Sequence, residues 1–254
     1  MSDYRIKFGN FHLWYNDPHD IAAIIETYVL NVYRIQKIKK NSIVVDIGAG
    51  IGEFTVLASS KVGKGGKIIA IEPSPEDFET LQKNIMENKC DNVIPINGAI
   101  TNKKEKLSLT FKEKNFEAEA DTLHSIIQKL NVPLSSIHYI KMDIEGAERL
   151  VIPSSIDIIR NIDYIAIEIH DGFASELLPY MINHGFMFKR VERNEYILNT
   201  IKRAVLQPID VYRLWKIFKN TGENPGLRKI SSGIDISKSN ELVVGMFFKP
   251  NKTI

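Results

Sequence analysis

Residues 44–55 read Val-Val-Asp-Ile-Gly-Ala-Gly-Ile-Gly-Glu-Phe-Thr, an apolar run followed by a glycine-rich turn. The apolar run predicts a buried strand over residues 42–47, and the residues after the turn predict a helix over residues 52–60. The three glycines, at positions 48, 50 and 52, allow the backbone to approach a ligand closely because they carry no Cβ atom. The stretch therefore predicts an α/β fold with a ligand-binding loop at the end of its first strand.

The spacing of these glycines indicates which ligand the loop binds. They fall as G-x-G-x-G, whereas dinucleotide-binding folds carry G-x-G-x-x-G, and Asp46 stands two residues before the first glycine. A pyrophosphate is held by backbone N–H groups at a helix N-terminus, without a nearby anion. S-adenosylmethionine (SAM) carries an amino group and a sulfonium that a carboxylate such as Asp46 could help to hold. The loop resembles that of SAM methyltransferases, so we expect it to bind SAM, with a plain strand-to-helix turn as the alternative.

The composition is that of a globular protein with one large domain over residues 1–254. The 254 residues are 44% hydrophobic and 25% charged, and the net charge is +2. The single cysteine, Cys90, excludes an internal disulfide and a cysteine-built zinc site. We expect a cytoplasmic protein, because we find neither a secretion signal nor a run of about 18 apolar residues that could span a membrane.

Strand and helix patterns alternate along the chain. We expect an N-terminal helical extension over residues 1–40, with one helix from Asp17 to near Ile38, then a core over residues 42–192 and an insertion over residues 195–240 before the last strand. Residues 103–120 are polar and predict a loop, with at most an extra strand over 107–111. The strands of the main sheet are expected at 42–47, 67–72, 92–97, 137–142, 164–169, 186–191 and 241–248. This order predicts a Rossmann-like, mostly parallel seven-stranded sheet with helices on both faces.

Two strand ends after the glycine loop fit a nucleoside. Glu72 ends the second strand, where a carboxylate accepts hydrogen bonds from ribose hydroxyls, although it could instead cap the helix that follows Pro73. Asn97-Gly98-Ala99 ends the third strand, where the adenine edge is expected, although a plain turn explains it equally well.

Residues 140–148 read Ile-Lys-Met-Asp-Ile-Glu-Gly-Ala-Glu and place three carboxylates within six residues, Asp143, Glu145 and Glu148. They follow a strand that should be central, where ligands bind in open α/β sheets. With the glycine loop and the acid after the second strand, this segment resembles the FkbM family of SAM-dependent methyltransferases. The resemblance runs from about Asp20 to Phe186. It implies methyl transfer to a hydroxyl oxygen of a sugar or polyketide, with Asp143 near the reactive methyl.

Two features depart from the family. The family often has asparagine where this chain has Gly50, and the insertion after Val191 has no counterpart that we can match. Two short helices are expected in that insertion, around residues 196–205 and 209–218. They are interpreted as a cover over the acceptor pocket or a dimer contact, with an anionic acceptor and RNA as lesser alternatives.

The strand over residues 164–169 alternates with period two, so Glu168 and His170 share one side. A buried carboxylate there needs a partner or a polar pocket. His170 could act as a general base, since its usual pKa of about 6.5 suits proton removal near neutral pH. The carboxylates of this region also suit magnesium or calcium, but we predict no metal. The oxygen-rich set comprises Asp143, Glu145, Glu168, His170 and Asp171.

We therefore predict a SAM-dependent O-methyltransferase that acts on a small-molecule or glycan acceptor. An RNA or metal-dependent methyltransferase and a SAM-binding module without catalysis are the alternatives. The predicted catalytic residues are Asp143, Glu145 and His170. The predicted cofactor-binding residues are Asp46, Gly48, Ala49, Gly50, Gly52, Phe54, Thr55, Glu72, Pro73, Asn97, Gly98, Ala99 and Asp143.

Overall fold

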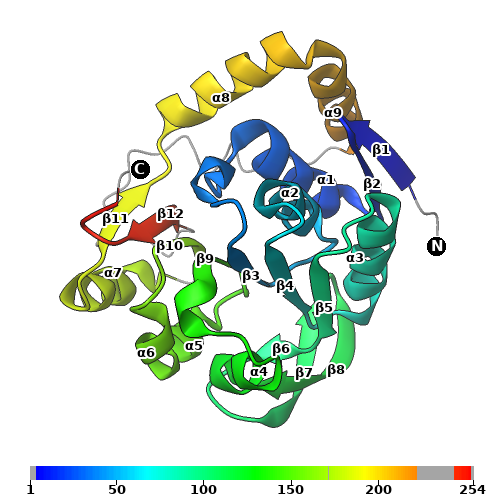
Figure 1. Cartoon of the computed structure of the whole chain (residues 1–254). Helices are drawn as coiled ribbons and strands as arrows, with labels where there is room; N and C mark the ends of the chain where they lie inside the picture. Colours follow the sequence, from blue (N-terminus) through cyan, green and yellow to red (C-terminus); the bar gives the residue numbers. More distant parts are fainter. Residues whose placement is uncertain (1–3, 171, 222–242, 253–254) are drawn as a thin grey trace.

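The computed structural model describes residues 4–170, 172–221 and 243–252, and its centre is a seven-stranded sheet (Figure 1). The strand order is β11-β12-β10-β9-β3-β4-β5. β12 pairs antiparallel with β10 and β11, and the remaining neighbours pair in parallel. The strands are β3 (Ile43–Ile47), β4 (Lys67–Glu72), β5 (Val93–Asn97), β9 (Ile137–Met142), β10 (Tyr164–Ile169), β11 (Met187–Arg190) and β12 (Val243–Phe248). The predicted Rossmann-like fold class is confirmed.

Helices cover both faces of this sheet (Figure 1). α2 (Glu53–Val62) and α3 (Pro75–Glu87) pack on one face, and α4 (Leu123–Lys129), α5 (Glu148–Ser154), α6 (Ile156–Ile159) and α7 (Ala174–Asn183) pack on the other. Strand side chains alternate between the two cores: Val44 joins the first, and Val45 joins the second. Ile165, Ile167 and Ile169 all lie in the second core, as the period-two pattern of β10 predicted.

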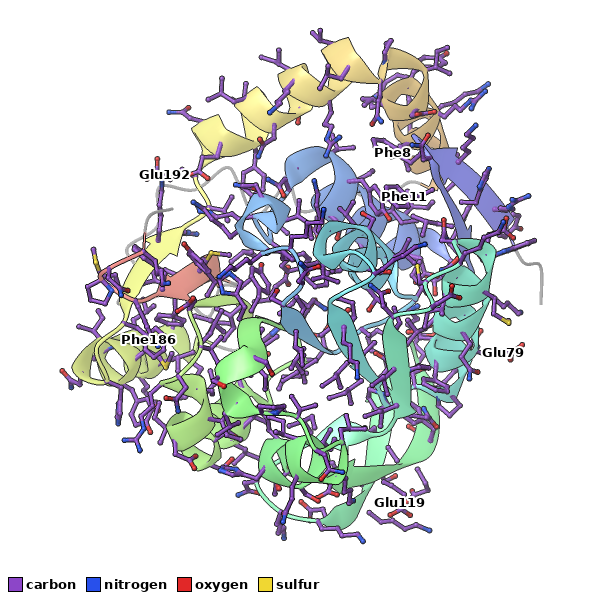
Figure 2. The ribbon with its side chains drawn as sticks, in the orientation of Figure 1. Phe8, Phe11, Glu79, Glu119, Phe186 and Glu192 are labelled. Atoms are coloured by element: carbon purple, nitrogen blue, oxygen red, sulfur yellow. The ribbon has the colours of Figure 1, made fainter. Side chains whose placement is uncertain are left out.

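The N-terminal region differs from the predicted helical extension. Residues before the helix form an antiparallel hairpin of β1 (Tyr4–Phe8) and β2 (Phe11–Tyr15), which carries Phe8 and Phe11 (Figure 2). The rings of both residues contact Tyr28. α1 (Pro18–Ile25) continues only as a π-helical turn, η1 (Glu26–Leu30).

The prediction of one helix as far as Ile38 was wrong. Asn31 and Arg34 adopt positive φ angles of 54° and 46°, which end the helix. The apolar residues between Tyr28 and Tyr33 are spaced as in a helix because their side chains are buried in the core, although the backbone there is no longer helical.

A second unpredicted hairpin lies over residues 105–121. β7 (Glu105–Phe111) pairs antiparallel with β8 (Lys114–Asp121), and β8 also pairs with β6 (Ala99–Ile100). Lys112 and Glu113 both adopt positive φ, which gives a two-residue turn of the twist that hairpins favour. The extra strand considered over residues 107–111 is present as part of β7, but the loop predicted for the rest of residues 103–120 was wrong. The reason is that this turn carries neither the glycine nor the asparagine that normally marks such a hairpin.

The insertion contains the two expected helices, α8 (Arg193–Leu206) and α9 (Pro208–Thr221), broken at Gln207. The remainder of the predicted insertion, residues 222–240, and the first two residues of the predicted last strand lie outside the described residues. Among the helices that are described, none is long and apolar enough to cross a membrane.

Candidate active site

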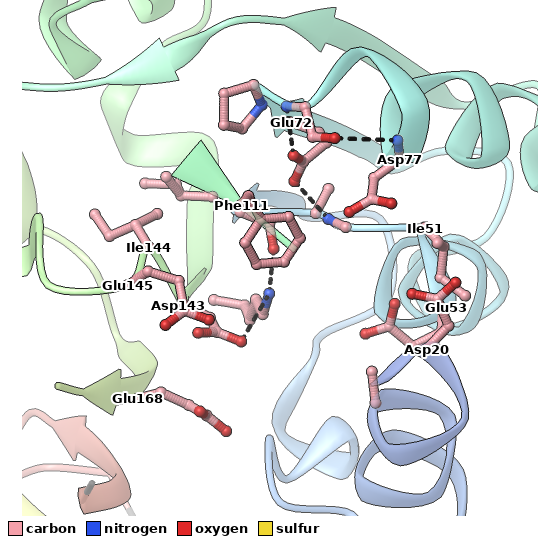
Figure 3. Close-up of a pocket in the computed structure, with 18 of the residues that line it drawn as sticks. Asp20, Ile51, Glu53, Glu72, Asp77, Phe111, Asp143, Ile144, Glu145 and Glu168 are labelled. Carbon is pink, nitrogen blue, oxygen red and sulfur yellow. Dashed lines mark hydrogen bonds and ion pairs between the residues drawn. The ribbon is translucent and has the colours of Figure 1, made fainter. Parts of the chain in front are cut away.

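A cavity of about 1650 Å³ lies at the carboxyl ends of β3, β4 and β9. The chain leaves β3 toward β4 and leaves β9 toward β10, in opposite directions along the sheet, so this is the switch point where open α/β sheets bind ligands. Ligand pockets usually measure about 300–1,000 Å³, so this cavity can hold a cofactor together with an acceptor. Its walls also include residues of α1, α9 and the β7–β8 hairpin, among them Phe111 (Figure 3).

The glycine loop is fixed against the two neighbouring strands. The N–H groups of Gly48 and Ala49 both donate to the Ile71 carbonyl at 3.0 Å, and the Asp143 N–H donates to the Ile47 carbonyl at 3.0 Å. Gly48 has φ +75°, and a Cβ atom there would lie 1.8 Å from the Asp143 carbonyl oxygen. Only glycine fits this position, and the close approach leaves Gly48, Ala49 and Gly50 in the pocket wall.

Glu72 also lies in the wall, beside Pro73, and its carboxylate is fixed by the loops around it. The N–H groups of Gly50 and Ser74 donate to its two oxygens, each at 2.7 Å. Burial raises the pKa of Glu72 to about 7. Gly98 and Ala99 line the same part of the pocket, but Asn97 does not: its amide donates to the Glu72 backbone carbonyl at 2.9 Å. Asn97 therefore shapes the site and stays outside the wall.

Four predicted cofactor-binding residues lie behind the loop, outside the pocket wall: Asp46, Gly52, Phe54 and Thr55. The reason is the geometry of β3 and α2, which turn the side chains of Asp46, Phe54 and Thr55 into the core, while the backbone of Gly52 packs against Leu81. The Asp46 carboxylate is fully buried and accepts a hydrogen bond of 2.5 Å from the Thr55 hydroxyl. The Phe54 ring packs between Tyr33 and Tyr139. Asp46 therefore lies behind the cavity wall, and its direct contact with the cofactor stays a prediction.

Lys141, in β9, is the lysine next to the glycine loop, and no role was predicted for it from the sequence. Its side chain is only 3% exposed, and its Nζ atom donates to the Gly48 carbonyl and lies 3.5 Å from Asp46 and 3.8 Å from Asp143. Although burial disfavours the charged form, the surrounding carboxylates raise the pKa of Lys141. A lone lysine among apolar residues of a central strand was a usable signal, because such a cation must meet an anion.

Glu53 lines the pocket at the first turn of α2, directly after the glycine loop. Its side chain is buried, and the Thr27 hydroxyl lies 3.5 Å from its Oε1 atom. Burial raises the pKa of Glu53 to about 8. Figure 3 shows Glu53 and Asp20 on one side of the pocket, with Asp143, Glu145 and Glu168 on the other. The sequence analysis missed Glu53, although its place next to Gly52 could have indicated it.

The acidic side of the pocket comes from the ends of β9 and β10. Asp143, Glu145 and Glu168 all line the cavity, and the Tyr33 hydroxyl donates to Asp143 Oδ2 at 3.2 Å. Glu145 adopts φ +52°, which turns the chain sharply after β9. Three carboxylates from two strands thus face one part of the cavity.

His170 lies behind these carboxylates, outside the pocket wall. Its Nδ1 atom is 3.1 Å from Glu148 Oε1, and its Nε2 atom is 3.3 Å from Glu145, 3.8 Å from Asp143 and 3.9 Å from Glu168. Burial disfavours the imidazolium, but the hydrogen bond with Glu148 and the charges of Asp143 and Glu145 raise the pKa of His170. Because both ring nitrogens face carboxylates, the geometry does not support the predicted role of direct general base.

Lys112, at the tip of the β7–β8 hairpin, fastens that hairpin over the cavity. Its Nζ atom lies 2.8 Å from Asp20, 2.9 Å from Asp17 and 3.1 Å from Asp77. The carboxylates of Asp20 and Asp77 are almost completely buried. Their mutual repulsion is offset by the lysine, which joins the hairpin to α1 and α3.

Replacing Lys112 with methionine is expected to lower the free energy of unfolding by about 3 kcal/mol at pH 8, because buried carboxylates lose their partner. Burial already raises the pKa of Asp77 to about 6. A carboxylate with a raised pKa in the folded state costs more stability as pH rises, since the folded protein then gives up a proton that it binds better than the unfolded chain does. The deficit should be smaller at pH 5.5. Urea unfolding at both pH values measures it, and an equal deficit at both would contradict this account.

Residues 46–188 match the family model described as methyltransferase FkbM domain. The hexuronic acid methyltransferase AglP of Haloferax volcanii is 21% identical over 150 residues, which are 54% of this chain and 60% of AglP. The tRNA (guanine(37)-N(1))-methyltransferase Trm5b of Methanocaldococcus jannaschii is 35% identical over 94 residues, 35% of this chain and 26% of that protein. The chain spans from about a fifth to three fifths of the length of these and other curated relatives.

Among solved structures, that of M. jannaschii TYW2 in complex with AdoMet aligns with a TM-score of 0.45 and 19% identity, over 75% of this chain and 78% of the other. A putative rRNA-methylase from Clostridium thermocellum aligns with a TM-score of 0.47 and 13% identity, over 94% and 98% of the two chains.

Proposed function

This chain belongs to the FkbM-domain methyltransferase family and uses SAM, and we propose that it methylates a hydroxyl oxygen of a sugar or another small molecule. The observation that carries this proposal is the acidic side of the cavity, formed by Asp143, Glu145 and Glu168. Carboxylates accept hydrogen bonds from hydroxyl groups, and three of them around one space suit an acceptor with several hydroxyls. The similarity to a hexuronic acid methyltransferase supports the same acceptor class.

The residues around the glycine loop suit SAM. Gly48 and Gly50 expose backbone at the pocket wall, and Glu72 lies where the ribose hydroxyls of a nucleoside would bind. We propose that Glu53, directly after the glycine loop and across the cavity from Asp143, binds the α-ammonium group of the cofactor, which was expected to lie near Asp46. A buried carboxylate with a raised pKa gains most from a cationic ligand, because the ligand replaces the solvation that burial removed.

SAM supplies a methyl group activated by a sulfonium, so the protein need only position the acceptor and take up a proton. We propose that Asp143 accepts the hydroxyl proton or orients the hydroxyl, since its carboxylate faces the cavity between Tyr33 and Lys141. Glu145 and Glu168 orient the acceptor, and His170 holds these carboxylates in place from behind.

If Glu53 binds the α-ammonium group, its replacement should weaken the binding of a ligand that carries this group and leave the binding of a ligand that lacks it nearly unchanged. Glu53→Gln should weaken binding of S-adenosylhomocysteine about 10- to 100-fold, because one hydrogen bond between charged groups is lost. Binding of 5′-deoxy-5′-methylthioadenosine, which lacks the amino-acid portion, should change less than about twofold. Calorimetric titration measures both affinities. Asp46→Asn is the matched comparison: if it alone produces this difference, Asp46 binds the ammonium group and the Glu53 assignment is wrong.

The acceptor proposal is tested with radiolabelled SAM and a panel of acceptors that includes hexuronic acids, neutral sugars and tRNA transcripts. Methyl transfer to a sugar hydroxyl, reduced about 100-fold or more in Asp143→Asn, supports the proposal. Glu117, exposed on β8, provides the control variant Glu117→Gln. Transfer to RNA alone would overturn the acceptor class, and SAM binding without transfer to any acceptor would favour a non-catalytic module.

A metal-assisted version of the same reaction is a second candidate. Asp143, Glu168 and His170 offer one ligand atom each, all within 4.8 Å of one another. Glu148 bonds the other ring nitrogen of His170, as carboxylates often do behind a metal-ligating histidine. Asp171, from the predicted set, lies outside the described residues. Loss of activity after chelation, with a rise in melting temperature when magnesium or manganese is restored, would support this version; indifference to both would exclude it.

A further inference from the structure

The outward sides of α8 and α9 carry an unusual number of exposed apolar side chains. Eight of the 14 large hydrophobic residues that are exposed in the described part of the chain lie on these two helices, with exposures from 46% to 75%. They are Ile197, Leu198, Ile201, Val205 and Leu206 on α8 and Ile209, Tyr212 and Trp215 on α9. Clusters of this kind on a soluble domain mark interaction sites. We call these residues, with the cations described next, the arm surface.

The charge of the arm surface has one sign. Lys202, Arg213, Lys216 and Lys219 are exposed on α8 and α9. The acids of these helices lie toward the body of the molecule: Glu195 pairs with Arg34 at 2.8 Å, and Asp210 accepts a hydrogen bond of 2.8 Å from the Gly9 N–H. Asp210 also lies 3.8 Å from Arg213 and partly offsets its charge. Among the described side chains, the arm surface therefore combines apolar residues with cations, and the lysines Lys202, Lys216 and Lys219 supply most of its positive charge.

The helices are held in this orientation by their inner sides. The Asn199 amide of α8 donates to the Leu30 carbonyl at 2.7 Å, and the Leu214 side chain of α9 is buried in the core. Figure 1 shows α8 along the outer edge of the molecule, away from the sheet, with α9 following it. The arm surface is thus a fixed, outward-facing feature of the fold.

We propose that the arm surface binds an anionic lipid surface. Helices that lie in a membrane interface carry lysine and arginine beside an apolar side with tryptophan and leucine, because acyl chains take up the apolar side and anionic head groups attract the cations. A second copy of the chain would bring like charges together, and a nucleic acid would leave the five aliphatic residues of α8 in water. An anionic lipid surface can bind both the apolar side chains and the cations of the arm surface.

The arm surface also borders the cavity. Trp215 and Lys219 line the pocket while remaining exposed, and the Lys219 ammonium lies 5.2 Å from the centre of the Trp215 ring. An acceptor held at a membrane would therefore meet the cavity at the edge where the protein docks. This point rests on the proposed function, but lipid binding itself does not, and it is measured without SAM or acceptor.

The test is sedimentation of the full chain with vesicles of phosphatidylcholine, with and without phosphatidylglycerol. We expect binding to the anionic vesicles only, weakened by salt, and reduced about tenfold in Ile201→Asp and in Lys216→Glu. Ile182→Asp, at an exposed position of α7, is the matched control and should bind as the unaltered protein does. Circular dichroism confirms that each variant is folded.

A second readout reports insertion of the arm itself. The chain has two tryptophans, so Trp14→Phe leaves Trp215 as the sole emitter, and its emission should shift to the blue on anionic vesicles. The proposal is overturned by equal binding to neutral vesicles, by no binding, or by an equal loss in Ile182→Asp. It is also overturned if the protein is a dimer that Ile201→Asp dissociates and that ignores vesicles.

Discussion

Lys141→Met is expected to lower the free energy of unfolding by about 3–5 kcal/mol, the usual effect of removing one partner from a buried ionic cluster. The lysine lies 3.5 Å from the Asp46 carboxylate, which is fully buried, and it also bonds the Gly48 carbonyl. Without it, Asp46 would be a buried anion held only by the Thr55 hydroxyl. Urea unfolding of the purified variant measures the change.

Two further variants show whether charge balance is the cause. Adding Asp46→Asn to Lys141→Met should recover part of the lost stability, because the unpaired anion is removed together with its partner. Lys104→Met, at an exposed position, should change the unfolding free energy by less than about 0.5 kcal/mol. If the double variant is less stable than Lys141→Met by the full cost of Asp46→Asn alone, the two residues are not coupled and the explanation is wrong.

Gly48→Ala is expected to destabilise the protein by about 4 kcal/mol or more and to abolish binding of S-adenosylhomocysteine. The added methyl group would lie 1.8 Å from the Asp143 carbonyl oxygen, so the glycine loop and the end of β9 would have to separate. These are the two segments that meet in the cavity. Thermal unfolding and calorimetric titration measure the two effects.

Gly185→Ala is the matched control for backbone conformation. Gly185 has φ +84°, close to the value at Gly48, but nothing lies within 4 Å of its missing Cβ. This variant should lose only about 1–2 kcal/mol, the cost of a left-handed alanine, and should bind the ligand normally. Equal losses in the two variants would show that conformation, not the contact with Asp143, makes glycine necessary at position 48.

Much of the fold followed from local pattern. The seven strands of the main sheet and the helix after the glycine loop were predicted, because buried strands and helices have distinct sequence patterns. The β7–β8 hairpin was missed for a local reason as well, because the Lys112–Glu113 turn lacks the residues that normally mark such a turn. The N-terminal helix was predicted too long because the apolar residues up to Tyr33 have helical spacing, although η1 and the left-handed Asn31 interrupt the helix.

In the candidate site, too, some features could be predicted from local sequence and others could not. Backbone contacts of the glycine loop and the place of Glu72 could be predicted, because a strand end followed by glycines puts its residues at the sheet edge in any fold of this class. The side chains of Asp46, Phe54, Thr55 and His170 were assigned to the ligand, but the structure places them behind the wall. Whether such a side chain points into the cavity or into the core depends on which helix or strand packs against it.

The amino-acid sequence alone was sufficient for the fold class, the family resemblance and the cofactor, because each depends on residues close together in the chain. Only the tertiary structure showed that Lys141 neutralises the acids behind the loop, that Glu53 faces the cavity, and that Lys112 fastens a hairpin over it. These groups are separated by tens of residues, and Coulomb and packing energies act through space, so distances and burial that exist only in the folded chain decide what each charge does.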